Sequence, residues 1–133
     1  MNYKIVIYGD PVVKKNGRSI FKNRATGRHF VGKSDRLIQA ERAAVLQLAS
    51  VDIDTITCPV TVAFKIYTRT RRKIDLSNAV QLYEDALERV EILENDSQIR
   101  SLDGTRQYLD RLNPRVEIHI SDFVDLGEGE CIM

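Results

Sequence analysis

Hydrophobic and polar residues alternate or recur in patterns that divide the chain into strands and helices. Strands are predicted where β-branched and aromatic residues form short runs: 3–8, 60–67 and 115–121. Helices are predicted where apolar residues recur at a helical spacing: 35–50 and 76–90. Ser34 and Asp75 are the expected N-caps of these helices. Because Asp103-Gly104 interrupts residues 99–109, we expect a hairpin or a bent strand there. The order β-α-β-α-β predicts an α/β (α+β) fold, with two main helices packed on a single mixed sheet.

Length and composition are those of one globular domain. The chain has 133 residues, of which 43% are hydrophobic and 29% charged, and such a chain can bury a core of its own. We expect one domain over 1–121 and a flexible acidic tail over 122–133, because no Lys or Arg follows Glu117 and glycines interrupt the last stretch. No apolar run is long enough for a bilayer or a signal peptide, so we expect a cytoplasmic protein without a membrane partner. Cys58 and Cys131 are far apart and predict neither a zinc site nor a disulfide.

Positive charge is concentrated in two stretches, although the net charge is only +1. Residues 11–33 contain seven basic residues and no acidic one, and a second basic run over 69–73 ends just before Asp75. Glycines and asparagines in the first stretch predict a loop or loose hairpin. Neutralising backbone phosphates releases counterions, so two such stretches suit a polyanion. Solvated surface loops are the alternative interpretation.

Carboxylates and amides recur along the second predicted helix. Asp75, Asn78, Gln81 and Asp85 fall close to one stripe, and Asp96 follows the turn after the helix. Carboxylates that lie together repel one another unless a cation lies between them, and oxygen ligands without Cys or His suit Mg²⁺ or Mn²⁺. A metal beside basic loops is an arrangement suited to phosphodiester hydrolysis. Taken singly, Asp75 is equally explained as an N-cap and Asp96 as a turn residue.

The stretch 71–99 resembles the RusA-like Holliday junction resolvases of bacteria and their prophages. That family pattern is a basic run, Asp-x-Asp-Asn, a Lys three residues further, Asp-Ala-Leu and then Asp-Asp-x-Gln-Val. This chain has, without a gap, Arg71-Arg72-Lys73-Ile74-Asp75-Leu76-Ser77-Asn78, Gln81, Asp85-Ala86-Leu87 and Asn95-Asp96-Ser97-Gln98-Ile99. The opening strand and the basic residues that follow it are also similar, so the resemblance covers most of 3–121. Ser77 stands where the family has its second aspartate, and Gln81 where it has its lysine.

This resemblance implies a crossover junction endodeoxyribonuclease that works in DNA recombination and repair. It implies a homodimer that cuts four-way DNA junctions by paired symmetric nicks, with Mg²⁺ (or Mn²⁺) and no organic cofactor. Asp75 and Asp96 match metal-binding aspartates of the family, while Asn78 and Asp85 match positions beside the site. We add the hypothesis that Asp85 supplies the carboxylate missing at Ser77, which makes Asp75, Asp96 and Asp85 the expected catalytic and metal-binding residues.

The remaining expectations concern DNA. Phosphate contacts are expected from Lys14, Lys15, Arg18, Lys22, Arg24, Arg28, Arg71, Arg72 and Lys73. Lys73, or a lysine of the first basic stretch, is the hypothetical replacement for the cation lost at Gln81. Ser77 and Gln81 also motivate an alternative, a protein on the same scaffold that binds branched DNA without cutting it.

Overall fold

The secondary structure of the chain follows the predicted pattern closely. The computed structural model describes residues 1–11, 18–22, 25–33 and 35–133, with the backbone alone for 18–22 and 30–33. Its elements are β1 (Asn2–Tyr8), β2 (Arg18–Lys22), β3 (His29–Lys33), α1 (Asp35–Ala49), β4 (Val60–Thr68), α2 (Leu76–Arg89), the 3₁₀ turn η1 (Asp96–Gln98), β5 (Ile99–Ser101), β6 (Arg106–Leu109) and β7 (Arg115–Asp122). The five clear elements begin and end within one residue of their predicted bounds. The predicted cap Ser34 lies outside the described residues.

A five-stranded mixed sheet forms the centre of the fold. β7 pairs antiparallel with β1 on one side and with β4 on the other. β5 and β6 both run parallel to β4 along its far edge. This confirms the mixed sheet with two helices. A separate antiparallel pair, β2 and β3, is an addition to the single sheet that was predicted.

Residues 99–109 form a bent strand, and the alternative prediction of a hairpin is wrong. β5 and β6 do not pair with each other, because each takes its backbone partners from β4. Between them the chain leaves the sheet in a turn closed by Thr105 N–H donating to Leu102 O at 3.0 Å. Gly104 in this turn has φ +91°, a conformation that favours glycine. The Asp103-Gly104 signal therefore marks an interruption within one edge of the sheet rather than a reversal of the chain.

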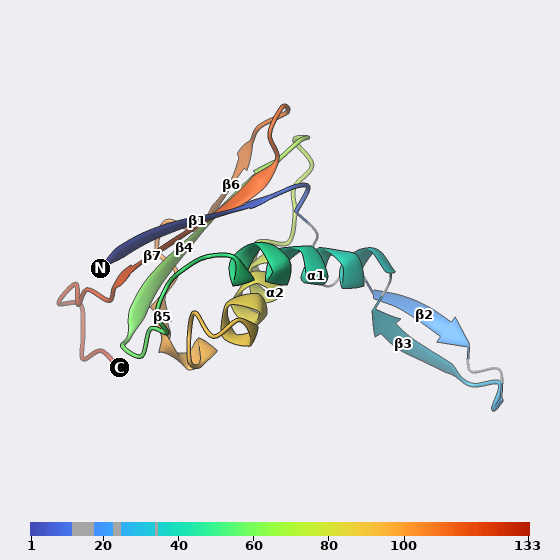
Figure 1. Cartoon of the computed structure of the whole chain (residues 1–133), viewed down its shortest axis with the longest axis horizontal. Helices are drawn as coiled ribbons and strands as arrows, with labels where there is room; N and C mark the ends of the chain where they lie inside the picture. Colours follow the sequence, from blue (N-terminus) through green and yellow to red (C-terminus); the bar gives the residue numbers. More distant parts are fainter. Residues whose placement is uncertain (12–17, 23–24, 34) are drawn as a thin grey trace.

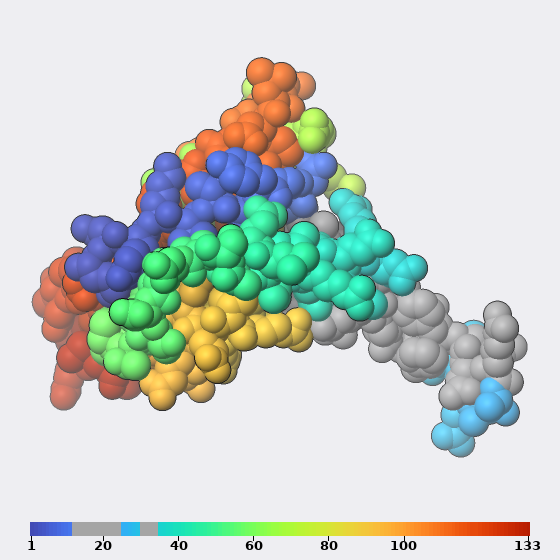
Figure 2. Space-filling view, in the orientation of Figure 1, coloured from blue at the N-terminus to red at the C-terminus, as the bar shows by residue number. Residues whose placement is uncertain are grey.

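Both helices pack on one face of the sheet (Figure 1), and the hydrophobic core lies between the helices and the sheet. The alternation predicted for β4 is realised, since its inward residues are fully buried: Val60, Val62, Phe64 and Ile66. α2 buries one face against them through Ala79, Val80, Leu82, Tyr83, Ala86 and Leu87. Figure 2 shows α1 crossing the front of the molecule beside β1, with α2 and the turn that follows it on its other side. The opposite face of α2 is left exposed.

The β2–β3 hairpin projects from the end of α1 that carries its N-terminus (Figure 1). Its register pairs Arg18 with Lys33 and Lys22 with His29. The hairpin confirms the prediction of a loop or loose hairpin for the first basic stretch. No helix in the described part of the chain combines the length and apolar character needed to cross a membrane.

The segment after β7 lies beside β5 without regular secondary structure. Phe123 N–H donates to Pro59 O at 3.4 Å, and Arg100 Nε donates to Ile132 O at 3.1 Å. The division into a domain over 1–121 and a flexible tail over 122–133 stays a prediction. Cys58 and Cys131 are both free thiols, as predicted.

Candidate active site

Asp75 begins α2 and is its N-cap. Its backbone is extended, and its Oδ1 accepts the Asn78 N–H at 3.2 Å, as a capping side chain does. Its Oδ2 accepts from Asn78 Nδ2 at 2.9 Å, so Asn78 fixes the carboxylate at both oxygens. Asp75 is nevertheless exposed, and a carboxylate can accept more bonds than these two. The capping role is therefore compatible with a ligand role at the same residue.

Asp96 opens η1, and Gln98 fastens this turn to the rest of the fold. Asn95 and Gln98 form a capping box, in which Asn95 Oδ1 accepts the Ser97 N–H and Gln98 Oε1 accepts the Asn95 N–H, each at 2.8 Å. Gln98 Nε2 also donates to Ile56 O at 2.7 Å and to Cys58 O at 3.1 Å. Asp96 itself is exposed on this fixed turn. The Asn-x-x-Gln spacing is the signal by which sequence analysis can find such an anchor.

The exposed face of α2 and the segment 96–105 enclose a groove, named here the α2 groove. Its first part, about 400 Å³, is lined by Ser77, Gln81 and Glu84 with Leu102 and Thr105 opposite. Its second part, about 480 Å³, is lined by Glu84 and Leu102 again, and by Asp96 and its neighbours up to Ser101. The two positions that depart from the family pattern therefore lie on the same groove as Asp96.

Glu84 lines both parts of the α2 groove, and the sequence analysis missed it. It follows Ser77 by seven residues and Gln81 by three, which places all three on one face of a helix. Partial burial raises the pKa of Glu84, and the negative charges of Asp96 and Asp85 raise this pKa further. Asp85, the residue predicted to supply the missing carboxylate, is exposed but lines neither part of the groove. The i+7 spacing from Ser77 is the signal that points to Glu84.

The described residues do not bring three carboxylates together. Nowhere among them do three or more His, Cys, Asp or Glu side chains form a group able to hold a metal ion, so Asp75, Asp85 and Asp96 are not one cluster. Glu84 and Asp96 share one part of the groove. Mg²⁺ is commonly bound in proteins by one or two carboxylates and completed by water and phosphate oxygens. The donors present fit an ion bound in that way, and the ligand assignments made from the sequence stay predictions.

The second basic run forms a loop between β4 and α2, and Gln107 anchors it. Gln107 Nε2 donates to Thr68 Oγ1 and to Arg72 O, both at 2.9 Å, and its Oε1 accepts the Ile74 N–H at 3.2 Å. Arg71, Arg72 and Lys73 are exposed, and no acidic side chain in the described part of the chain forms a salt bridge with them. Their charges are therefore available to an external anion.

Replacing Gln107 with leucine is expected to weaken binding to a four-way junction by about tenfold. Three hydrogen bonds are lost, two to the loop and one to Thr68 at the end of β4, each contributing about 1 kcal/mol, so the loop spends less time in its binding conformation. The slope of affinity against salt concentration should stay unchanged, because the phosphate contacts keep their number. Fluorescence anisotropy over a series of salt concentrations measures both quantities.

Arg72→Ala is the matched control, since it removes one of the expected phosphate contacts and should lower that slope by about one. If Gln107→Leu bound the junction like the unmodified protein while its unfolding temperature fell, Gln107 would be a stability residue without a role in DNA binding.

Most of the first basic stretch lies where no side chain is described. Lys14, Lys15 and Arg24 are outside the described residues, and so are the side chains of Arg18 and Lys22. Arg28 is described and exposed, in the turn between β2 and β3. The DNA-binding roles expected for these residues stay predictions.

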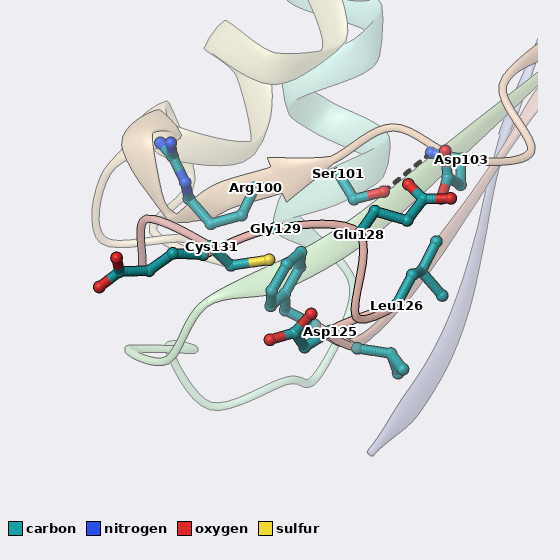
Figure 3. A pocket seen from close by; sticks show the side chains of 11 residues that line it. Arg100, Ser101, Asp103, Asp125, Leu126, Glu128, Gly129 and Cys131 are labelled. Atoms are coloured by element: carbon teal, nitrogen blue, oxygen red, sulfur yellow. Dashed lines mark hydrogen bonds between the residues drawn. The ribbon is translucent and has the colours of Figure 1, made fainter.

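A third hollow, of about 250 Å³, lies between β5 and the segment after β7 (Figure 3). Acidic side chains reach it from both sides: Asp103, Asp125, Glu128 and Glu130. This charge repels phosphate, so the hollow is not a candidate site for a nucleic acid. Arg100 and Ser101 line both this hollow and the second part of the α2 groove, which places the acidic segment at one end of the groove.

Comparison with known proteins adds the family. The family model described as Endodeoxyribonuclease RusA matches residues 9–121, which is most of the chain and includes every residue named above for the groove and the basic loop. The search of curated proteins found no match. Nucleases of this family are generally metal-dependent. The chain belongs to the RusA family of Holliday junction resolving endodeoxyribonucleases.

Proposed function

We propose that this chain acts as a Mg²⁺-dependent homodimer, with Mn²⁺ as a substitute ion, that resolves four-way DNA junctions by paired symmetric nicks. The observation that supports this best is the division of charge along α2. The exposed basic residues Arg71, Arg72 and Lys73 stand with Asp75 at its start, and the acidic residues Glu84 and Asp96 share the groove further along its exposed face. Phosphate binding and metal binding therefore have separate places beside one helix.

The residues have distinct proposed roles. Arg71, Arg72 and Lys73, together with the basic hairpin, bind backbone phosphates, which orient the DNA without reading its bases. Asp75 and Asp96 bind the divalent cation. When bound, such an ion supplies a hydroxide nucleophile at neutral pH and neutralises the leaving oxygen. Gln107 and Gln98 position the basic loop and the Asp96 turn. The additional carboxylate ligand is either Asp85, as expected from the sequence, or Glu84, which lines the groove.

A homodimer matches the symmetry of the substrate. A four-way junction in which two strands of like polarity are cut has a two-fold axis, and a two-fold dimer presents two identical sites to it. Junction shape, rather than base sequence, then governs recognition. A DNA substrate of this kind supports the expectation of a cytoplasmic protein.

The proposal is tested by incubating the protein with a labelled synthetic four-way junction and with a linear duplex of matched sequence, with and without Mg²⁺. We expect paired nicks in the junction only, and only when Mg²⁺ is present. Asp75→Asn should bind the junction and leave its strands intact. Asparagine caps a helix about as well as aspartate, so this variant should unfold at nearly the same temperature.

Binding of the junction without cleavage would point to the alternative function. Intact junction strands after long incubation, with Mg²⁺ present and binding preserved, would support the branched-DNA-binding alternative that Ser77 and Gln81 suggest. Equal binding to junction and duplex would contradict both readings.

A further inference from the structure

We infer that Glu84 is a metal ligand of this chain and the partner of Asp96, and that it takes over the negative charge that the family pattern places at residue 77. The inference rests on the proposed function, because it concerns the metal on which that function depends. It replaces the assignment of Asp85 made from the sequence.

Glu84 lies on the face of α2 that lines the groove. Ser77, Gln81 and Glu84 line the same part of the groove, so the uncharged replacements for the family aspartate and lysine are followed on that face by a carboxylate. Asp85 is its immediate neighbour in sequence. Successive residues of a helix are rotated by about 100° around the helix axis, so the side chains of Glu84 and Asp85 lie on different faces of α2. Only Glu84 of these two lines the groove.

Asp96 is the carboxylate that lies in the groove with Glu84. Glu84 and Asp96 line the second part of the groove together, and Asp96 is on a turn that Gln98 fastens. Asp75 lines neither part of the groove. Glu84 is therefore the carboxylate that the groove places beside Asp96, in addition to the ligand role proposed for Asp75.

Among the described residues, no cationic side chain forms an ion pair with Glu84 or Asp96. Arg100 lines the same part of the groove, but its guanidinium donates to the backbone oxygens of Ser97 at 3.2 Å and Ile132 at 3.1 Å. Two neighbouring carboxylates without a cation repel each other, and a divalent ion removes that repulsion.

The test measures ion binding separately from cleavage, using the full chain and Mn²⁺ as the probe. Free Mn²⁺ is followed by its paramagnetic resonance signal during titration of the unmodified protein, Glu84→Gln and Asp85→Asn. Glu84→Gln should bind Mn²⁺ at least about tenfold more weakly, because an amide oxygen carries no charge. Asp85→Asn, the matched control on the adjacent residue, should stay within about twofold of the unmodified protein.

Thermal unfolding with and without Mn²⁺ gives a second measurement that a purely structural role would not change. An ion that binds only the folded chain raises its unfolding temperature. The unmodified protein and Asp85→Asn should show this rise and Glu84→Gln should not. Without Mn²⁺, Glu84→Gln should unfold at the same or a higher temperature than the unmodified protein, because its repulsion with Asp96 is gone.

Three results would overturn the inference: normal Mn²⁺ affinity of Glu84→Gln, loss of affinity in Asp85→Asn alone, or no binding of millimolar Mn²⁺ by the unmodified protein. Failure of the proposed function has a different signature, in which Mn²⁺ binds through Glu84 and the junction is never cut.

Discussion

Replacing Asp96 with asparagine is expected to slow junction cleavage by at least about a hundredfold, because a metal ligand supplies several kcal/mol of transition-state stabilisation and about 1.4 kcal/mol corresponds to a factor of ten. Asp96 is the carboxylate at which the expectation from the family resemblance and the α2 groove coincide, since it is an expected metal ligand and shares the groove with Glu84. The loss of its charge should therefore impair cleavage as severely as Asp75→Asn is expected to.

The variant should fold normally. The turn that carries Asp96 is formed by Asn95 and Gln98, and their hydrogen bonds do not use the Asp96 side chain. The pKa of Glu84 is raised mainly by burial and further by the charges of Asp96 and Asp85, so it should fall part of the way toward its usual value when the Asp96 charge is removed. Junction affinity without metal should be unchanged or slightly higher, since one negative charge near the DNA is lost.

Single-turnover cleavage at saturating protein measures the chemical step, and anisotropy without metal measures binding. Asp103→Asn is a matched control, because Asp103 is an exposed acidic residue that does not line the α2 groove. Cleavage by Asp96→Asn at a rate near that of the unmodified protein would remove Asp96 from the metal site, and with it the assignment carried over from the family.

The elements predicted from the sequence are those whose cause is local. β4 alternates apolar and polar residues because one of its faces lies on the core, and α2 shows a helical apolar period because one of its faces does. Asp75 is recognisable as a cap because its partner Asn78 is only three residues away. In each case the pattern and its physical reason lie within one element of the chain.

The features that sequence analysis missed depend on contacts between distant segments. Gln107 holds a loop more than thirty residues earlier in the chain, at Arg72 O, and nothing near it in sequence indicates this. For residues 99–109 the sequence left a hairpin and a bent strand open, and the pairing of β5 and β6 with β4 decides for the bent strand. The sequence near Glu84 likewise does not indicate its neighbour, since its place beside Asp96 depends on how η1 returns along α2.

The departures at Ser77 and Gln81 gain a physical meaning from the groove. Compared with the family pattern, Ser77 removes one negative charge and Gln81 removes one positive charge. The net charge of this face of α2 is therefore unchanged. Glu84 is then the charged side chain that lines the first part of the α2 groove, and Asp96 joins it in the second part. DNA bound by the basic loop would approach these carboxylates across Ser77 and Gln81, which carry no charge.

Replacing Phe64 with alanine is expected to lower the free energy of unfolding by about 3 to 5 kcal/mol, the usual cost of truncating a buried phenylalanine. Phe64 is 0% exposed in the middle of β4, with its ring centroid 6.4 Å from that of Tyr83 on α2. The cavity left behind would lie between the sheet and the helix that carries the groove. Since a whole domain is stable by only about 5 to 15 kcal/mol, a large share of the stability is at stake.

Urea denaturation followed by circular dichroism measures this loss. Phe64→Leu should cost less, about 1 to 2 kcal/mol, because most of the buried volume is kept, and it remains folded if the alanine variant does not. Leu112→Ala is the matched control, since Leu112 is 95% exposed and its truncation should change the stability by less than about 0.5 kcal/mol. Equal losses at Phe64 and Leu112 would contradict the placement of the core.

The effect of Phe64 should extend to the site through Thr105. Phe64 N–H donates to Thr105 Oγ1 at 3.2 Å, and Thr105 lines the first part of the α2 groove. A cavity under α2 lets both walls of the groove shift, whereas the basic loop keeps its two hydrogen bonds with Gln107. At temperatures where Phe64→Leu is fully folded, cleavage should therefore fall more than junction affinity does. Equal losses in both would mean that the groove and the basic loop move as one unit.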